Sequence, residues 1–574
     1  MKRIAIVGGG QSGLQLAFGL LGNGYDVTVY TDRDADEVGS GPVMSAQCMF
    51  ESSLQLERDL SLDLWHEEAP EIASISMTRT DATGALLTSW TARLDNPARS
   101  VDQRLKISTW MRHFVAAGGS LVVGRVDLEE LDRIAVDVDL VVVATGLSEL
   151  GSLFPIDEER TRFDRPQRAL ALTYYEGAQE ADQAGKRYFH IRGVGEYYSL
   201  PALTAKGSCE IMMIEAVPGG PLDRWGEVAS GAEHLARCKE FLEEYLPEEA
   251  ARCRDIRLTD DGGYLTGRFT PVVRHPIGTL PSGRLVLGMA DAVVLNDPVT
   301  AQGANNAAKS ADIYLQSIMA RGDDPFDEDW MQETFERYWQ GYGEWAVAWT
   351  NSMLEFEGSP GEQLVEAAAT SPALAKFIVN GYNDPRNLYP AWFDAAESRL
   401  LIERSIREDN ASQFDTRALR RALGQFATGV VVVTTRGEDG ERIGLTVNSF
   451  TSVSMDPPLV LWCLSSESRN LEAFRRAEQF NIHVLASDQH HLSRRFSSPH
   501  AEKFEGMTDP DSTITPVLEG AAAQFLCNNV RQYTEGDHEI FIGEVREFTQ
   551  FEQEPLVFHS GTYRVATRHP DFAI

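Results

Sequence analysis

The chain has 574 residues, which is too many for one ordinary hydrophobic core, so we expect two or three domains. Its formal net charge of −34 argues against binding to nucleic acid or to an anionic membrane surface, because both would repel an acidic partner. The six scattered cysteines contain no C-x-x-C pair, so neither a disulfide framework nor a zinc or other metal site is expected.

The first residues give no sign of a secretion signal. Met1-Lys2-Arg3 lead directly into the short apolar run 4–7, and no later apolar run approaches the roughly 18 residues that cross a bilayer. We therefore expect a cytoplasmic protein that does not enter a membrane.

The first element is a βαβ unit that predicts a dinucleotide site. A buried strand over 4–7 runs into a G-x-G-x-x-G motif, and a second strand follows over 25–30. The glycines of this motif permit a tight turn, close approach of the backbone to a pyrophosphate, and packing of the helix on the strand. They are Gly8, Gly10 and Gly13. Asp32 follows the second strand, and it either binds the ribose or belongs only to the turn.

Two later segments favour FAD over NAD. A buried strand that ends in Thr145 and Gly146 resembles the strand and turn of FAD-dependent proteins with two dinucleotide-binding folds. Residues 285–291 resemble the second FAD fingerprint of the aromatic hydroxylase superfamily, which implies that Asp291 binds the ribityl chain. Ala290 stands where that fingerprint usually has glycine.

The turn 297–306 continues this resemblance. In the family it opens a long helix that points at the flavin, and the positive end of such a helix favours an anionic flavin by a few tenths to about 1 kcal/mol. An ordinary helix start is the alternative interpretation. The residues implied to lie against the flavin are Pro298, Gly303, Ala304 and Asn305.

The expected domain boundary is a polar stretch between Ile402 and Phe414. Before it, βαβ patterns are followed by a strand-rich middle and a helical tail, whereas strands dominate after it. This shift predicts an α/β module followed by a mainly β module.

Residues 1 to about 395 resemble the oxygenase component of the styrene and indole monooxygenases. The motifs that carry the resemblance are Val27–Arg33, Arg99–Leu105, Arg165 and Asn296–Asn305. It implies a Rossmann-type, aromatic hydroxylase-like oxygenase over 1–405, with Arg104 among the FAD-binding residues. The implied FAD-binding parts are about 1–70, 95–165 and 275–320, the β-rich substrate part is about 70–95 and 165–275, and the helical tail is 320–400.

The resemblance also implies the chemistry. These oxygenases take reduced FAD from a reductase, form a flavin C4a-hydroperoxide with O2, and transfer one oxygen atom to an electron-rich double bond or a sulfide. Because the cofactor carries this chemistry, the protein needs no strong acid or base of its own. A small aromatic substrate, either of the indole type or a broader aryl alkene, is expected.

The indole-preferring branch of this family implies a substrate pocket. Its serine, glutamine and methionine at alternate positions match Ser45, Gln47 and Met49. Alternation along an extended strand would place these three side chains on one cavity wall. An amphipathic strand packed on the sheet is the alternative. The accompanying pocket positions are Ile72, Ile75 and Ala98.

Residues 414–574 resemble the flavin reductases that serve two-component monooxygenases, and 406–413 form the expected linker. The motifs are Phe426–Thr434, Gly444–Ser454, Pro457–Leu464, Asn481–Leu485, Lys503–Phe504, Gly536–Gly543 and Pro555–Gly561. The resemblance implies a split β-barrel that uses NADH and forms a homodimer, with the flavin at or near the dimer interface.

The same resemblance implies the reductase site. His538 is the expected catalytic residue, and it would position the nicotinamide for hydride transfer. A hairpin turn is a second, compatible interpretation of Gly536-Asp537. The residues implied to bind cofactor are Thr446, Asn448, Ser449, Cys463, Ser465, Ser468, Lys503, Gly536 and Asp537.

Together these features predict a self-sufficient flavin monooxygenase, and three alternatives remain open. The N-terminal half could instead be a single-component hydroxylase that binds NADPH. It could also be a store of reduced flavin that releases hydrogen peroxide, or a non-catalytic flavin-binding sensor.

Overall fold

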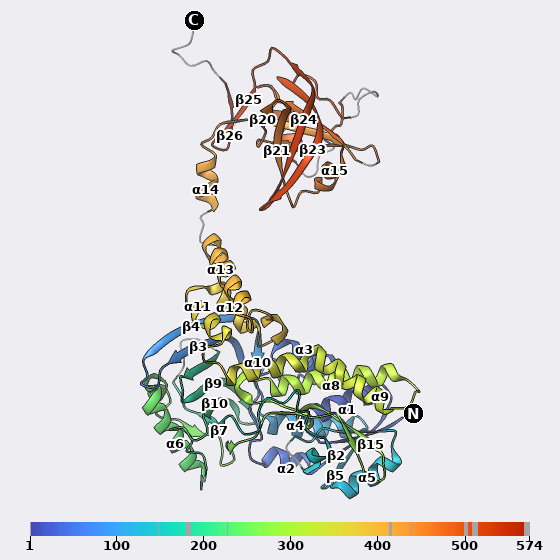
Figure 1. Cartoon of the computed structure of the whole chain (residues 1–574), viewed down its shortest axis with the longest axis vertical. Helices are drawn as coiled ribbons and strands as arrows, with labels where there is room; N and C mark the ends of the chain where they lie inside the picture. The colour runs from blue at the N-terminus through green and yellow to red at the C-terminus, as the bar shows by residue number, and fades with distance from the viewer. Residues whose placement is uncertain are drawn as a thin grey trace. The chain divides into compact units, whose positions relative to one another are not determined.

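The computed structural model describes residues 2–146, 149–179, 185–226, 228–412, 416–437, 439–498, 503–507 and 515–566. The chain divides into two compact units, Met1–Ser412 and Gln413–Ile574 (Figure 1). Each unit has hydrophobic core clusters of its own, so each is described by itself.

A largely parallel sheet organises the first core of the N-terminal unit. In the described part of the chain its six strands follow the order β14-β15-β6-β1-β2-β5, and only β14 and β15 pair in antiparallel fashion. The strands are β1 (Arg3–Val7), β2 (Asp26–Thr31), β5 (Ser120–Val123), β6 (Leu140–Val143), β14 (Ile277–Thr279) and β15 (Leu285–Gly288).

The βαβ unit expected at the N-terminus is present. Strand β1 is buried along Ile4–Val7, as a central parallel strand must be. It is joined to the parallel strand β2 by α1 (Gln11–Gly22), which is buried along most of its length. On the same core lie α4 (Gln103–Ala116) and α5 (Leu128–Asp137).

A second, larger sheet carries the second core of this unit. Among the described residues its order is β11-β7-β10-β9-β8-β3-β4, with β12 also paired to β7. Most pairs are antiparallel, but β3 and β8 run parallel. The strands are β3 (Glu71–Thr80), β4 (Leu86–Arg99), β7 (Ala169–Glu176), β8 (Lys186–Ile191), β9 (Gly195–Thr204), β10 (Gly207–Ala216), β11 (Arg257–Leu258) and β12 (Tyr264–Gly267).

One face of this second sheet packs against helices from the end of the unit, and α6 (Gly231–Tyr245) and α7 (Pro247–Arg252) cover the other. The long helix α8 (Gly303–Arg321) lies along α1 in the first core. The helices that follow are α9 (Glu328–Tyr338), α10 (Glu344–Leu354), α11 (Pro360–Ala367), α12 (Pro372–Asn380) and α13 (Ala395–Ser412).

Helix α13 extends into the expected linker. Residues 406–412 form the end of this helix, while Gln413 lies outside the described residues. Arg404 and Arg407 lie 3.8 and 3.9 Å from Glu408 and Glu403, four positions away in each case. Such pairs stabilise an exposed helix, which explains why a polar sequence remains helical here.

The C-terminal unit is built on an antiparallel sheet. Within its described residues, seven strands follow the order β19-β18-β22-β23-β24-β21-β20. They are β18 (Val431–Arg436), β19 (Arg442–Val447), β20 (Thr451–Met455), β21 (Pro458–Ser465), β22 (Gln479–Val484), β23 (Ala523–Glu535) and β24 (His538–Gln550). Trp462 is fully buried and stacks on Phe541 with ring centroids 4.6 Å apart, which fixes β21 against β24 in the core.

None of the helices in the described part of the chain combines the length and the apolar character that a membrane span requires.

Candidate functional site

The first candidate site is a cavity of about 890 Å³ at the carboxyl ends of the parallel strands β1, β2, β5 and β6. Parallel sheets bind ligands at this edge because the connecting loops and helix N-termini meet there. The predicted residues that line this cavity are Gly8, Gly10, Asp32, Thr145 and Gly146.

The three glycines of the motif occupy three different environments. Gly8 has a φ of +126°, and a Cβ added there would lie 2.5 Å from the carbonyl oxygen of Ala144. A Cβ at Gly13 would lie 2.0 Å from the Gly8 carbonyl oxygen, so the close approach of helix and strand requires glycine. No atom lies within 4 Å of a Cβ at Gly10, which borders the cavity.

Several residues that sequence reasoning missed also line this cavity. Gln103 begins α4, and Arg33 and Arg125 follow the parallel strands β2 and β5. Both arginines lie close to acidic residues of the same cavity, Arg33 at 3.7 Å from Asp32 and Arg125 at 2.6 Å from Glu149. Arg33 and Arg125 could have been predicted from the sequence, because each lies just after the end of a parallel strand.

A smaller cavity of about 370 Å³ shares Gly146 and Glu149 with the first one. Asp291 lines this smaller cavity, where its side chain is exposed to solvent. A hydroxyl-bearing ligand that donated hydrogen bonds to Asp291 would favour the ionised carboxylate.

The turn before α8 is fastened to the segment around Cys48. The side chain of Asn305 donates to the Cys48 carbonyl oxygen at 2.8 Å and accepts from the Phe50 backbone N–H at 3.0 Å. Pro298 begins a 3-10 turn, and Gly303 begins α8, where a Cβ would meet no atom within 4 Å. The start of α8 therefore presents backbone N–H groups without an intervening side chain at Gly303.

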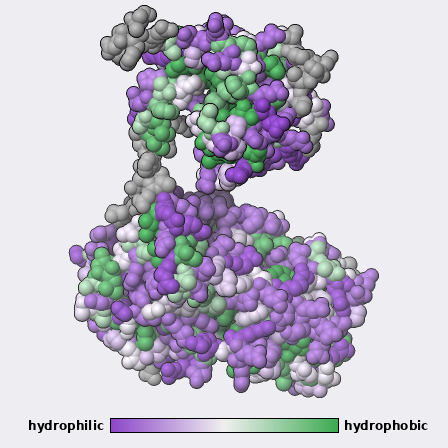
Figure 2. Space-filling model, turned by 45° about the horizontal axis from the view of Figure 1, so that its top comes forward, coloured by the Kyte–Doolittle hydropathy of each residue, from purple (hydrophilic) through white to green (hydrophobic). Residues whose placement is uncertain are grey.

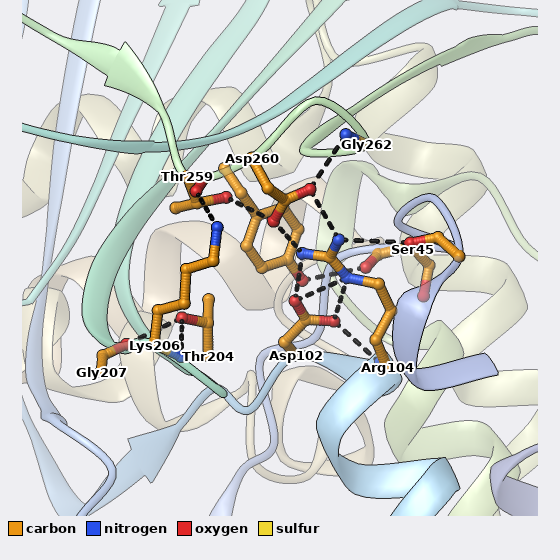
Figure 3. Close-up of polar contacts among 11 residues, drawn as sticks. Ser45, Asp102, Arg104, Thr204, Lys206, Gly207, Thr259, Asp260 and Gly262 are labelled. Atoms are coloured by element: carbon orange, nitrogen blue, oxygen red, sulfur yellow. Dashed lines mark hydrogen bonds and ion pairs between the residues drawn. The ribbon is translucent and has the colours of Figure 1, made fainter. Parts of the chain in front are cut away.

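Arg104 does not line the first cavity, in contrast to the cofactor contact expected for it. Its guanidinium lies 2.7 Å from Asp102 and 2.9 Å from Asp260 and donates to the Gly41 carbonyl oxygen at 3.3 Å (Figure 3). Burial acts to lower the pKa of Arg104, but hydrogen bonds to Asp260 and Asp102 raise it. Two carboxylates already occupy the guanidinium, so Arg104 fastens α4 and the loop at Gly41 to the second sheet.

The same attachment holds the loop that carries Ser45. The Tyr174 hydroxyl donates to the Ser45 carbonyl oxygen at 3.1 Å, and the Val43 N–H donates to the Gly262 carbonyl oxygen at 2.9 Å. Contrary to the expected extended strand, residues 42–48 form no strand. Because the backbone groups of these residues bond to separate partners, the alternating positions of Ser45, Gln47 and Met49 do not place their side chains on one cavity wall.

The six residues of the expected pocket accordingly divide between two places. Ile72, Ile75 and Ala98 lie in the core between the second sheet and the terminal helices. Met49 forms a single bridge with Arg99 and packs in a different cluster, beside α8.

Gln47 belongs to a buried polar chain beside Met49. Its amide donates to the side-chain oxygen of Gln11 at 2.6 Å, and the Gln11 amide donates to the Ala304 carbonyl oxygen at 3.1 Å. The Gln11 amide also lies 3.5 Å from Glu57, which forms a buried ion pair with Lys106. Burial raises the pKa of Glu57 and the ammonium of Lys106 lowers it. These hydrogen-bonded side chains connect α1, α4 and the start of α8.

The C-terminal unit contains a cavity of about 820 Å³. The Ser449 hydroxyl accepts from the Cys463 N–H at 2.9 Å, which joins two walls of this cavity. Lys503 donates to the carbonyl oxygens of Gly444 at 3.1 Å and Phe496 at 2.9 Å, and burial lowers its pKa. The predicted residues that line the cavity are Thr446, Asn448, Ser449, Cys463, Ser465, Ser468, Lys503 and His538.

The other two predicted residues of this site form the turn between β23 and β24. Gly536 has a φ of +61°, as the hairpin interpretation requires, and Asp537 lies 2.8 Å from the His538 ring. This turn places His538 at the cavity wall. Arg442 and Arg469 also line the cavity and were missed, because neither belongs to a motif on which the prediction rested.

Family comparisons divide the chain in the same way. Residues 423–567 match the family model "Flavin reductase like domain", and residues 146–252 match "Styrene monooxygenase A putative substrate binding domain".

Two relatives cover complementary parts of the chain. Styrene monooxygenase StyA of Pseudomonas fluorescens is 30% identical over 393 residues, which are 67% of this chain and 93% of the relative. FMN reductase (NADH) SmoA of Agrobacterium fabrum is 42% identical over 170 residues, which are 29% of this chain and 97% of the relative.

One similar solved structure is the NADH:FAD oxidoreductase SgcE6 of Streptomyces globisporus, in complex with NAD and FAD fragments. It is 36% identical and covers 28% of this chain and 95% of its own, with a TM-score of 0.26.

The N-terminal relative matches nearly its full length, as does the C-terminal one. The chain therefore belongs to the styrene monooxygenase family in its N-terminal unit and to the flavin reductase family in its C-terminal unit, which makes it a flavin monooxygenase fused to a reductase domain.

Proposed function

We propose that the C-terminal unit reduces FAD with NADH, and that the N-terminal unit uses this reduced FAD and O2 to oxygenate indole, styrene-type alkenes and aryl sulfides. The observation that carries the proposal is the presence, in one chain, of a cavity at the glycine motif and a second cavity around His538. Each cavity lies in a unit whose family is established by comparison.

The residues of the N-terminal unit fit FAD. The pyrophosphate fits at Gly10, where no atom fills the space of a Cβ, between the side chains of Arg33 and Arg125. The ribityl hydroxyls fit the carboxylate of Asp291 in the adjoining cavity, and the isoalloxazine ring fits the start of α8 at Gly303. When bound and reduced, FAD supplies the electrons that activate O2 for transfer of one oxygen atom.

The protein's own contribution is to bind, orient and exclude water. Asn305 holds the Cys48–Phe50 segment against the start of α8, and Gln11 holds Gln47. Ile72 and Ile75 are at most 1% exposed, so the core next to this segment offers an apolar surface to an aromatic substrate. Exclusion of water at such a site suppresses the loss of activated oxygen as hydrogen peroxide.

In the reductase unit, the polar groups of Thr446, Asn448 and Ser449 suit the flavin edge and phosphate. His538 lies where it can orient the nicotinamide, and hydride transfer needs such orientation more than it needs a base. FAD is proposed as the shared flavin because both units must use it. NADH is proposed because the relatives SmoA and SgcE6 are named for it.

Dimerisation of the reductase unit is part of the proposal. Met455, Phe426 and Phe548 are 87%, 77% and 74% exposed on this unit. Figure 2 shows apolar residues gathered on its visible face. Large exposed apolar side chains of this kind mark association surfaces, which supports a homodimer through the reductase unit.

The deciding experiment is indole turnover by the purified chain with NADH, catalytic FAD and air. Blue indigo, which forms after oxidation of indole, is the expected product and requires both units. If NADH is consumed, hydrogen peroxide accumulates, and indole, styrene and an aryl sulfide all remain unchanged, the chain is an NADH:FAD oxidoreductase that releases peroxide, and the oxygenase proposal is wrong.

A further inference from the structure

One buried cation of the N-terminal unit differs from all the others. In the described part of the chain, the buried lysines and arginines are Arg79, Arg99, Arg104, Lys106, Arg168, Lys186 and Arg252. Six of these seven contact a carboxylate. Among the described residues, the Nζ of Lys186 has neither an ion-pair nor a hydrogen-bond partner, although the side chain is 0% exposed.

Three tyrosine rings surround this ammonium. Its Nζ lies 4.5 Å from the ring centroid of Tyr198, 4.9 Å from that of Tyr382 and 5.7 Å from that of Tyr188. Aromatic faces stabilise a cation but accept none of its three N–H hydrogen bonds in the way an oxygen does. Burial lowers the pKa of Lys186, and Cys48 and Glu215 act against this shift. The protein thus keeps an ammonium out of water without giving it an acceptor.

Lys186 lies beside residues expected to line the substrate pocket. On the second sheet it pairs in parallel register with Ile75. The tyrosines around it belong to the same buried cluster as Ile72, Ala98 and Val299, and Val299 directly follows Pro298 in the turn before α8. Lys186 therefore lies in the same buried cluster as the residues expected to line the substrate pocket, which we call the substrate wall.

Other buried polar atoms near this wall also lack partners. The Tyr188 hydroxyl and the side-chain nitrogen of Asn296 have no hydrogen-bond partner among the described residues. Buried polar atoms in folded proteins are nearly always bonded, and a cluster of exceptions marks a place that water or a ligand completes. The neighbouring half-buried cation Arg187 contrasts with Lys186, because it lies 2.9 Å from Glu210.

We propose that Lys186 binds a carboxylate carried by the aromatic substrate, so that the preferred substrates are anionic aryl alkenes or indoles. This inference rests on the proposed oxygenase function and narrows its substrate class. A carboxylate supplies the acceptor oxygens that Lys186 lacks among the described residues. Indole and styrene themselves bring no such acceptor.

The acidic groups near this wall do not oppose an incoming carboxylate. Burial raises the pKa of Glu215 well above its usual value, and it raises the pKa of Asp297 to about 7. In its protonated form, which burial favours, Glu215 would donate a hydrogen bond instead of repelling an anion. Glu196 carries its charge in a pair with Arg168 at 2.6 Å.

Binding of unreactive analogues tests the inference without turnover. The FAD-loaded full chain, without NADH, is titrated calorimetrically with 4-ethylbenzoate and with its neutral analogue 4-ethylbenzamide. We expect the wild type to bind the benzoate about tenfold or more tightly than the benzamide. The Lys186→Met variant, which keeps the length of the side chain, should lose this preference and bind the benzamide within about twofold of wild type.

The matched control is Lys376→Met, because Lys376 is an exposed lysine paired with Asp95; it should keep the wild-type preference. Equal binding of the two analogues by wild type overturns the inference even if Lys186→Met fails to fold. A preference for benzoate that persists in a folded Lys186→Met variant also overturns it. Turnover of 4-vinylbenzoate, indole, styrene and an aryl sulfide is measured separately, so intact benzoate binding without any oxygenated product would contradict the oxygenase function and leave the Lys186 site standing.

Discussion

At the scale of single residues, the N-terminal cavity depends on the absence of side chains as much as on their presence. Gly13 allows α1 to approach the turn at Gly8 so closely that a Cβ would lie 2.0 Å from a carbonyl oxygen. Backbone atoms cannot move aside as the end of a flexible side chain can. Addition of one methyl group at Gly13 would therefore force α1 away from the turn at Gly8.

Gly13→Ala should lower the free energy of unfolding by about 2 kcal/mol and release FAD from the oxygenase unit. The measurements are urea unfolding and retention of flavin after gel filtration. Gly22→Ala is the control within the same helix, because no atom lies within 4 Å of its Cβ, and it should stay within about 0.5 kcal/mol of wild type. Equal effects of the two substitutions would contradict the steric argument.

His538 is the residue on which hydride transfer should depend most. His538→Asn should lower kcat/KM for NADH by about ten- to hundredfold, since loss of orientation costs this much. Steady-state NADH oxidation with excess FAD measures the effect. His491→Asn, an exposed position on the short helix α16 (His490–Ser497), should leave kcat/KM unchanged. If His538→Asn behaves like this control, the histidine has no role in positioning.

At the scale of elements, buried polar contacts decide how α1, α4 and the start of α8 meet. Lys106 on α4 and Glu57 on α3 (Glu51–Asp59) are 2% exposed and form an ion pair that also contacts Gln11 of α1. Such a pair contributes little net stability, but removal of one partner leaves an unpaired charge in the interior.

Lys106→Met should therefore cost about 3–5 kcal/mol at pH 7, because Glu57 loses its cation. Lys106→Met combined with Glu57→Leu should recover most of this loss, since no charge then remains buried. A double-mutant cycle on urea unfolding measures both. The exposed ion pair between Lys376 and Asp95 supplies the reference, because Lys376→Met should lower the free energy of unfolding by less than about 1 kcal/mol. If the double variant is no more stable than Lys106→Met, an uncompensated charge is not the cause.

At the scale of the whole molecule, the proposed function assigns one reaction to two units with separate cores. The N-terminal unit holds the glycine cavity and the buried substrate wall, and the C-terminal unit holds the His538 cavity. Reduced flavin must pass between them, and a covalent connection keeps the acceptor concentration independent of dilution.

This connection predicts a concentration effect. For the fused chain, the yield of indigo per NADH should stay constant as enzyme is diluted from micromolar to nanomolar. For the two units expressed as separate chains, it should fall, because an effective concentration of about 1 mM from the tether is lost. Product and NADH are quantified with catalase present. A yield that falls equally for both forms would show that the reduced flavin escapes into solution before use.

The two units should also respond to acid, and His483 gives the clearest case. This histidine of the C-terminal unit is fully buried, and burial lowers its pKa from 6.5 to about 4. The unfolded state then binds the proton first as pH falls, so stability is constant above about pH 6.5 and is lost between pH 6.5 and 4, by roughly 3 kcal/mol.

Calorimetry of the full chain across this range checks the effect through the transition of the reductase unit. His483→Gln should flatten the dependence on pH, and the exposed His491→Gln should not. An equally steep dependence in His483→Gln would mean that another group controls the response to acid.

The sequence by itself determined the local parts of both sites. Gly13 acts through its close contact with the turn at Gly8, and most of the predicted reductase residues line one cavity. Motifs of this kind can be interpreted from sequence because neighbours along the chain dictate the backbone.

Only the tertiary structure decided which long side chains were free to act. Arg104 is held by Asp260, 156 positions away, and Gln47 by Gln11 on α1, whereas Lys186 alone among the buried cations of the described chain meets no carboxylate. A charged side chain looks the same in sequence whether or not it is paired. Its partner is chosen by packing between distant elements, and in the interior that choice decides whether the charge holds the fold together or remains available to a ligand.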